Sequence, residues 1–402
     1  MHVFIGLSGG MGPVLRTVPI ARQLVQNKMK VTFSVYGPSS QMWIERLGFR
    51  HEADTDPTMP GAAFLLPKQP HFYHLDHYYA QQGLLDRHFL SSWIEHRIHM
   101  LEKLEADVVI ADLSPHTLIA AKVLGIPSIS LTQSCLHASG KPLNYWTQTP
   151  RNIPKVVPVL NDLLRSYQLP PIERMEECNR GDLDMVPSIP ELDPFHDRSV
   201  QFVGPISMDL HTDSPSLRPF QEPWPVILVY PGRMTDAAGA SGNRLVQAVV
   251  QAFGNRPVHV ILATDEKLPP ALHHSTAFPQ NIQIVASYNE EMLGKADLFI
   301  HHGGHGSCLS ALMSGVPSLI IPTQTEREFN ARQAASLGIA EYMLPDTFTS
   351  AHLYELSRYM LDDHYQDRTL ELRKAVLRRG YRGAKEVSDK VKLIYKRNVH
   401  RS

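Results

Sequence analysis

The stretch from Asp297 to Ala331 constrains the fold more than any other part of the chain. An apolar run at Leu298–Ile300 leads into the turn HHGGHGS, and a helical pattern follows the turn and ends at Gly315. A second apolar run, Ser318–Ile321, stops at a proline. Strand, glycine turn, helix and strand make a βαβ unit, and such units build parallel sheets. The sequence therefore predicts an α/β fold.

The turn in this unit is also a candidate anion site. Its glycines allow the backbone to approach a ligand closely. The helix that follows offers unpaired N–H groups and the positive end of its dipole, which together favour a phosphate. His302, at the end of the strand, can add a hydrogen-bond donor. The alternative is an ordinary glycine-rich turn that binds no ligand.

Length and composition limit the class of protein. With 402 residues, two domains are the natural expectation. A net charge of −1 gives no electrostatic reason to expect binding to nucleic acid or to an acidic membrane surface. Three cysteines argue against a disulfide framework. No signal peptide or membrane-spanning run is recognisable, so we expect a cytoplasmic protein without an integral membrane segment.

The N-terminus repeats the strand–turn–helix pattern. Val3–Leu7 reads as a buried strand, SGGMGP as a glycine turn, Val14–Asn27 as a helix and Val31–Tyr36 as a second strand. The glycine spacing is not GxGxxG, and the second strand ends without an acidic residue for a ribose. Both features argue against a site for NAD.

The segment HHGGHGS and its surroundings resemble the nucleotide-sugar site of GT-B glycosyltransferases, in particular the UDP-glycosyltransferase and antibiotic glycosyltransferase superfamily. The superfamily pattern reads roughly THxGxxSxxEAxxxGVPxxxxPxxxDQxxNA. The residues in register are His302, Gly304, Ser307, Gly315-Val316-Pro317, Pro322 and Asn330-Ala331. The resemblance implies an α/β GT-B fold, in which two Rossmann-like domains face each other across a cleft.

The resemblance also implies the domain boundaries. We expect an acceptor-binding domain over residues 1–205 and a linker over 206–223, where Ser, Asp and Pro are frequent. A donor-binding domain should follow over 224–379. A C-terminal helix at about 380–402 should pack back on the first domain.

In the resembling family the donor is a nucleotide sugar. The HHGGHGS turn would hold its diphosphate, the residues after Ala286 its base, and Glu326-Arg327 its sugar hydroxyls. Ser310 stands where relatives that use UDP-sugars hold a glutamate for the ribose, so a dTDP-sugar is a reasonable donor beside a UDP-sugar. The expected donor-binding residues are Gly232, Arg233, Ser287, Tyr288, His302, Gly304, His305, Gly306, Ser307, Glu326 and Arg327.

The sequence indicates the catalytic base less clearly than the donor-binding residues. Many relatives carry a histidine or aspartate in the N-terminal glycine turn, but this turn holds Gly10, Met11 and Gly12, none of which accepts a proton. We rank His137 first as an alternative base, because it follows a strand by a short loop, and His74 second. Asp112, at the position of a histidine-orienting aspartate in relatives, is an acidic alternative. His71, His77 and His116 are further candidates, and an acceptor that is already ionised would need no base.

A metal site is the weaker reading of the histidine-rich segment. His71, His74 and His77 recur at a three-residue helical step and could share one face. No cysteine lies near them, and the chain has no HExxH motif. We therefore expect no metal and no cofactor beyond the nucleotide-sugar substrate.

The resemblance implies an inverting, metal-independent sugar transfer from a UDP- or dTDP-sugar to a small acceptor, such as a natural product in antibiotic biosynthesis. One alternative is a hydrolysing nucleotide-sugar epimerase, which shares the architecture but has no acceptor pocket. A second is a catalytically silent homologue that acts as an auxiliary protein. A monomer or a homodimer would be compatible with each of these functions. The donor, the acceptor and the type of linkage stay open.

Overall fold

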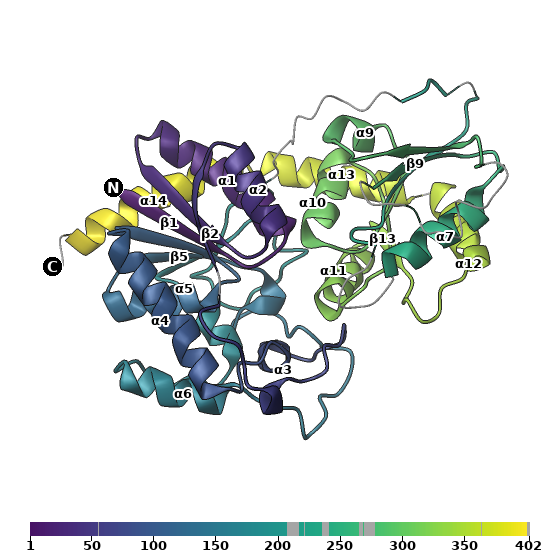
Figure 1. Cartoon of the computed structure of the whole chain (residues 1–402). Helices are drawn as coiled ribbons and strands as arrows, with labels where there is room; N and C mark the ends of the chain where they lie inside the picture. Colours follow the sequence, from purple (N-terminus) through teal and green to yellow (C-terminus); the bar gives the residue numbers. More distant parts are fainter. Residues whose placement is uncertain are drawn as a thin grey trace. The chain divides into compact units, whose positions relative to one another are not determined.

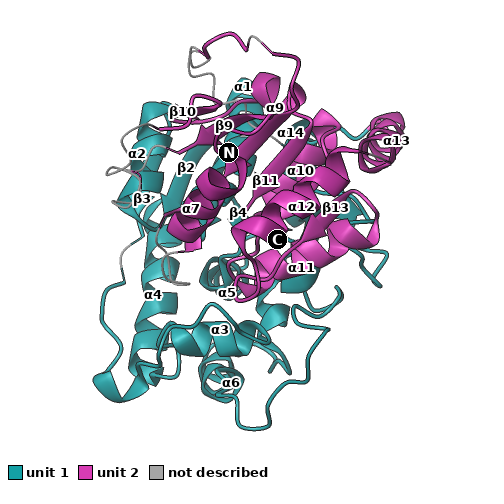
Figure 2. Ribbon diagram, turned by 90° about the vertical axis from the view of Figure 1, so that its right-hand side faces the viewer, with its two compact units in different colours: residues 1–208, 381–402 teal, residues 209–380 magenta. Residues whose placement is uncertain are grey.

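The structure is a computed structural model, and it describes residues 1–54, 56–206, 217–220, 222–234, 241–264, 268, 278–362 and 364–399. Two compact units divide the chain (Figure 2): Met1–Met208 with Tyr381–Ser402 form unit 1, and Asp209–Gly380 form unit 2. Each unit holds one parallel sheet. Two separate parallel sheets with helices between their strands confirm the predicted α/β class. Most of the segment expected as a linker, 206–223, lies outside the described residues.

Unit 1 alternates strands and helices along most of its length (Figure 1). Its elements are β1 (His2–Leu7), α1 (Met11–Gln26), β2 (Lys30–Val35), α2 (Pro38–Arg46), β3 (Arg50–Ala53), η1 (Ala62–Phe64), α3 (Leu75–Gln81), α4 (Arg87–Lys103), β4 (Val108–Asp112), α5 (Pro115–Leu124), β5 (Ser128–Leu131), η2 (Ser134–Leu136), α6 (Val157–Ser166), η3 (Met175–Asn179), β6 (Leu183–Val186), β7 (Gln201–Phe202) and α14 (Ala384–Val399).

The sheet of unit 1 has the order β3-β2-β1-β4-β5-β6-β7. The chain reverses direction across the sheet between β1 and β4, which is the switch point where open α/β sheets bind ligands. The strands there end at one level, because Leu7 pairs with Val35 on one side and with Asp112 on the other. The residues that follow these three strands therefore share one edge.

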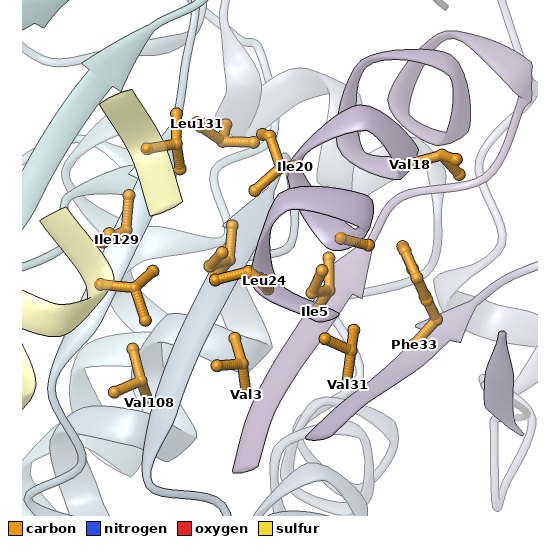
Figure 3. Close-up of a cluster of buried hydrophobic side chains, with 14 of the residues drawn as sticks. Val3, Ile5, Val18, Ile20, Leu24, Val31, Phe33, Val108, Ile129 and Leu131 are labelled. Atoms are coloured by element: carbon orange, nitrogen blue, oxygen red, sulfur yellow. The ribbon is translucent and has the colours of Figure 1, made fainter. Parts of the chain in front are cut away.

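Alternation along β1 explains how both faces of this sheet are covered. Val3 and Ile5 join a buried cluster with α1 and α14, whereas Phe4 joins a second cluster with α4 and α5. Figure 3 shows side chains of α1, Leu24 among them, close to those of β1. Each fully buried Val or Ile stabilises the fold by about 1.5–3 kcal/mol. The core thus fixes the strand ends that carry the polar residues.

The C-terminal helix α14 belongs to unit 1. Val387 and Val391 are fully buried in the cluster that holds α1 and the sheet. At the end of α1, the side-chain amide of Asn27 donates to the Ser388 hydroxyl at 3.0 Å. Apolar burial and this bond together attach the last helix to the first.

Unit 2 repeats the pattern with a shorter sheet of order β10-β9-β8-β11-β12-β13. Its elements are β8 (Val226–Tyr230), α7 (Ser241–Phe253), β9 (His259–Ala263), β10 (Ile282–Val285), α9 (Glu290–Gly294), β11 (Leu298–His301), α10 (His305–Ser314), β12 (Ser318–Ile320), α11 (Thr325–Ser336), β13 (Ala340–Tyr342), α12 (Ser350–Leu361) and α13 (Tyr365–Arg378).

Both faces of this sheet are also covered. Ile227 and Val229 of β8 pack in one buried cluster with α7 and α12, while Leu228 packs in another with α9 and α10. The switch point lies between β8 and β11, where Tyr230 pairs with His301 at the strand ends. The turns after these two strands therefore lie side by side.

Two helix boundaries differ from the sequence prediction. Helix α1 begins at Met11, so Met11 and Gly12 form its first turn, and only Ser8–Gly10 make the loop. The C-terminal helix expected at about 380–402 begins later, at Ala384 of α14, because α13 ends at Arg378 and Gly380 and Gly383 adopt positive φ angles of 65° and 52° between the two helices. Glycine tolerates these angles, and they end the first helix.

Candidate functional site

The glycine turn after β11 has a shape that larger residues would disturb. Gly303 has a φ of 87°, and a Cβ there would lie 2.9 Å from the carbonyl oxygen of Arg327. The amide of Gly303 donates to Nδ1 of the buried His301 at 3.1 Å, and its carbonyl accepts from the side chain of Asn330 at 3.0 Å. Asn330 of α11 thus holds the turn in place, which explains why this asparagine is in register with the motif.

Helix α10 begins directly after this turn. Its N-cap is Gly304, which has no side chain to cap the helix, and the amide of Cys308 donates to the carbonyl of Gly304 at 3.1 Å. The N–H groups of His305, Gly306 and Ser307 precede that bond and have no acceptor within the helix. His305 and Ser307 are buried, and Gly306 is exposed. The start of the helix can therefore accept an anion.

His302 lies between the turns after β8 and β11. Its ring is edge-on to Tyr230, with centroids 5.3 Å apart, and a Cβ at Gly232 would lie only 3.1 Å from it. Burial lowers the pKa of His302 well below its usual value, and the cation of Arg327 adds to the effect. Its Nδ1 is buried and has no hydrogen-bond partner among the described residues. The structure thus offers a neutral imidazole with one polar atom unused.

Tyr288 follows β10 and contacts the helix start through its hydroxyl, which hydrogen-bonds Ser307. Its ring lies 5.2 Å from the rings of both Tyr230 and Phe299. Burial raises the pKa of Tyr288, so its hydroxyl stays protonated. Tyr288 is therefore placed to orient Ser307. Ser287, the residue before it, is exposed.

The remaining predicted donor residues lie on two neighbouring elements. Arg233 follows β8 and is exposed. Glu326 of α11 accepts from the Asn330 side chain at 2.8 Å, the same amide group that holds Gly303. Arg327 donates to the Thr323 hydroxyl. Unit 2 thus places His302, Ser307, Glu326 and Arg327 around one turn.

In unit 1, Asp112 ends β4 at the switch point and is almost fully buried. Arg16 of α1 donates to both of its carboxylate oxygens, from Nε to Oδ2 and from Nη2 to Oδ1 at 2.7 Å. The carboxylate therefore has a partner that the sequence analysis missed. The signal was a basic residue one turn into the helix that follows the glycine turn.

His137 does not lie where a base could meet an acceptor. Its side chain is fully buried, and Nε2 lies 3.1 Å from the Asp184 carboxylate. Nδ1 accepts from the hydroxyl of Ser139 at 2.9 Å. Both ring nitrogens are occupied within the fold, so the structure contradicts the ranking of His137 as the first candidate base.

His71, His74 and His77 pack among aromatic side chains, and the three histidines do not share one helical face. His74 is the N-cap of α3, and its Nδ1 accepts from the amide of His77 at 3.1 Å. His71 lies before the helix and packs on Tyr73. Burial lowers the pKa of both His74 and His77. In the part of the chain that the structure describes, no three His, Cys, Asp or Glu side chains group as metal ligands.

The comparisons with known proteins agree with this fold and turn. Residues 247–391 match the family described as "Erythromycin biosynthesis protein CIII-like, C-terminal domain". The NDP-glycosyltransferase YjiC of Bacillus licheniformis is 28% identical over 247 residues, which are 59% of each chain.

Among the described residues, no helix combines the length and hydropathy needed to cross a membrane.

Solved structures match over nearly the whole chain. The calicheamicin glycosyltransferase CalG4 has a TM-score of 0.76 at 20% identity and covers 98% of both chains. The spinosyn rhamnosyltransferase SpnG, solved with thymidine diphosphate, has a TM-score of 0.73 at 17% identity and covers 98% of this chain and all of its own. The fold is therefore GT-B. Together with the sequence matches, it confirms the resemblance to the UDP-glycosyltransferase and antibiotic glycosyltransferase superfamily.

Proposed function

We propose that the chain is a glycosyltransferase that moves a sugar from a nucleoside-diphosphate sugar to a small natural-product acceptor. The observation that carries the proposal is the turn after β11, where the half-buried ring of His302 and the start of α10 offer hydrogen-bond donors to one anion. The names of the relatives, a curated NDP-glycosyltransferase among them, support the same class of reaction.

The turn suits a leaving nucleoside diphosphate. Negative charge develops on the leaving oxygen as the sugar departs, and donors already in place stabilise that charge without reorganising. A neutral His302 can donate from one nitrogen, and the dipole of α10 favours the anion. Ser307, held by Tyr288, adds a hydroxyl. Because these groups supply the stabilisation, we expect transfer to continue in the presence of a metal chelator.

For the donor, we propose a dTDP- or UDP-sugar. Ser310 of α10 is short, so it binds ribose hydroxyls less strongly than a glutamate would. The thymidine diphosphate in a structurally similar protein supports a deoxyribose donor. We further propose inversion at the anomeric carbon, because a single displacement uses one leaving group, one acceptor and one base.

The decisive test is nucleotide binding and turnover in a His302→Ala variant. We expect dTDP and UDP to raise the melting temperature of the wild-type chain, since a ligand that binds only the folded form stabilises it. The variant should lose most of this rise and about a hundredfold or more in transfer rate. The matched control is His352→Ala, an exposed histidine on α12, which should keep both.

Unchanged nucleotide binding and turnover in His302→Ala would contradict the assignment. Product analysis separates the alternatives within the same assay. Epimerised or free sugar with nucleotide released, and no glycoside, would indicate a hydrolysing epimerase. Nucleotide binding without any turnover would indicate an auxiliary protein.

A further inference from the structure

Polar side chains gather at the carboxyl ends of β2 and β3, beside the N-terminal glycine turn. Val35 and Ala53 pair at the strand ends, so Tyr36 and Asp54 follow them at one level, and Asp56 lies two residues on. A Cβ at Gly9 would lie 3.6 Å from the Cβ of Tyr36, which brings Tyr36 against the turn after β1. This edge adjoins the switch point of unit 1, where open α/β sheets bind ligands.

The two aspartates of this group have different surroundings. Asp54 is buried and accepts from Arg97 of α4, and its Oδ2 lies 3.3 Å from Nε2 of His116. Its burial would raise the pKa, but the guanidinium and the imidazole lower the pKa of Asp54 to about 2. It is therefore a permanent carboxylate, fixed within the fold.

Asp56, in contrast, is exposed and accepts from the Tyr36 hydroxyl at 3.1 Å. Its partial desolvation raises the pKa of this carboxyl, the hydrogen bond from Tyr36 opposes the rise, and the charge of Asp54 adds to it. The groups that face Asp56 from the elements around it are Tyr36, Asp54 and His96. Paired carboxyl groups with pKa values pushed apart are typical of acid–base chemistry.

The orientation of Tyr36 is fixed from the other side. The indole N–H of Trp93 donates to the Tyr36 hydroxyl at 2.6 Å, so that hydroxyl directs its own proton to Oδ1 of Asp56. Burial raises the pKa of Tyr36, which keeps it protonated. Among the described residues, Oδ2 of Asp56 has no hydrogen-bond partner. Oδ1 of Asp56 is therefore held by Tyr36, while Oδ2 can accept a proton.

We propose that Asp56 is the general base of the transfer reaction, with Tyr36 as its positioning residue. Asp56 takes the proton of the acceptor hydroxyl as that oxygen forms a bond to the anomeric carbon. The bond from this carbon to the diphosphate oxygen breaks, and its electron pair leaves with the nucleoside diphosphate. The inference rests on the proposed function. It supplies the base that neither Asp112, held by Arg16, nor the buried His137 provides.

Acceptors of different acidity provide the test. With dTDP-glucose or UDP-glucose as donor, Asp56→Asn should transfer sugar to an aliphatic alcohol such as cyclohexanol at least about a hundredfold more slowly than wild type. Transfer to para-nitrophenol, which is largely ionised in mildly alkaline solution, should fall by no more than a few-fold. Asp162→Asn, an exposed aspartate on α6, is the matched control and should leave both rates unchanged.

The pH profile distinguishes a catalytic role from a structural one. Wild-type kcat/KM for the alcohol should rise as Asp56 loses its proton and then level off. Tyr36→Phe removes a hydrogen bond that favours the ionised carboxyl, so the rising limb should move to higher pH. Asp56→Asn should lose this limb.

The outcomes separate this inference from the proposed function. If Asp56→Asn transfers to both acceptors at nearly the wild-type rate, or loses both rates equally, Asp56 is not the base. In either case, if dTDP or UDP still raises the melting temperature of Asp56→Asn, the proposed function is not contradicted. If the wild-type chain neither binds these nucleotides nor transfers sugar, the function and the base assignment both fail.

Discussion

Arg16 donates two hydrogen bonds to the carboxylate of Asp112, and this pair joins the first turns of α1 to the end of β4. The backbone carbonyl of Asp112 also accepts from the amide of Ser8 at 3.0 Å. The glycine turn after β1 is therefore held from two sides by one aspartate. A residue at this position can serve the fold whether or not a catalytic histidine stands beside it.

Breaking this pair should destabilise unit 1. Only 14% of the Arg16 side chain and 1% of the Asp112 side chain are exposed. Arg16→Ala leaves a buried charge unpaired, and we expect it to lower the free energy of unfolding by about 3–5 kcal/mol, measured with urea. The exposed pair Arg165–Asp162 is the control, and Arg165→Ala should cost about 1 kcal/mol or less. Equal effects in the two variants would contradict the role of burial.

Gly303→Ala should disturb the anion turn. The new methyl group would meet the Arg327 carbonyl at 2.9 Å, on a backbone whose φ of 87° disfavours any side chain. We expect a loss of about 1–3 kcal/mol in unfolding free energy and weaker binding of dTDP in calorimetry. Gly294→Ala is the control, because a Cβ there would meet nothing within 4 Å. A Gly303→Ala variant that binds dTDP as tightly as wild type would argue against this turn as the diphosphate site.

Ser310 should permit deoxyribose donors. We expect dTDP-glucose to be used at least as well as UDP-glucose in the same transfer assay, since a serine at this position demands little from the ribose. Ser310→Glu should move the preference toward UDP-glucose by offering a stronger acceptor to its additional hydroxyl. A strong wild-type preference for UDP-glucose would count against this reading.

His116 should make stability depend on pH. Burial, with the neighbouring Arg97, lowers the pKa of His116 from 6.5 to about 4. Below pH 6.5 the unfolded chain binds a proton that the folded chain does not, so stability falls as the pH drops and levels off below 4. Between pH 7 and pH 5 this group accounts for about 2 kcal/mol of lost stability.

The measurement for His116 is urea unfolding at both pH values. Even if His116→Gln is less stable at pH 7, its loss on acidification should be smaller than that of wild type. His352→Gln, which changes an exposed histidine, should show the wild-type loss. An identical pH dependence in His116→Gln and wild type would show that the imidazole does not titrate in this way.

Local patterns were enough to predict much of the fold. The helix after the HHGGHGS turn was predicted to end at Gly315, and α10 ends at Ser314 because Gly315 adopts a φ of 77°. The strand predicted at Val3–Leu7 is β1, which spans His2–Leu7. The HHGGHGS turn was recognisable because glycines, a histidine and a helix start follow one another directly along the chain.

Partners that are distant along the chain were not predictable in this way. Asp184, which holds His137, lies 47 residues from it, and Asp54 lies 43 residues from Arg97. Which of these groups meet depends on the sheet order and on the packing of α4, neither of which a local pattern encodes. The start of α1 was missed for a local reason, because Gly12 and Pro13 suggested a turn although both are tolerated in a first helical turn.

The position of α14 has a consequence for synthesis. Unit 1 is built from two chain segments, and all of unit 2 is translated between them. During translation the first segment leaves the ribosome with the apolar surface that Val387 and Val391 later cover still open to water. Domains generally fold in the order in which they emerge. Unit 1 emerges first but is completed last, because α14 is translated after all of unit 2. The core of unit 1 therefore stays partly exposed in the nascent chain until α14 has been made.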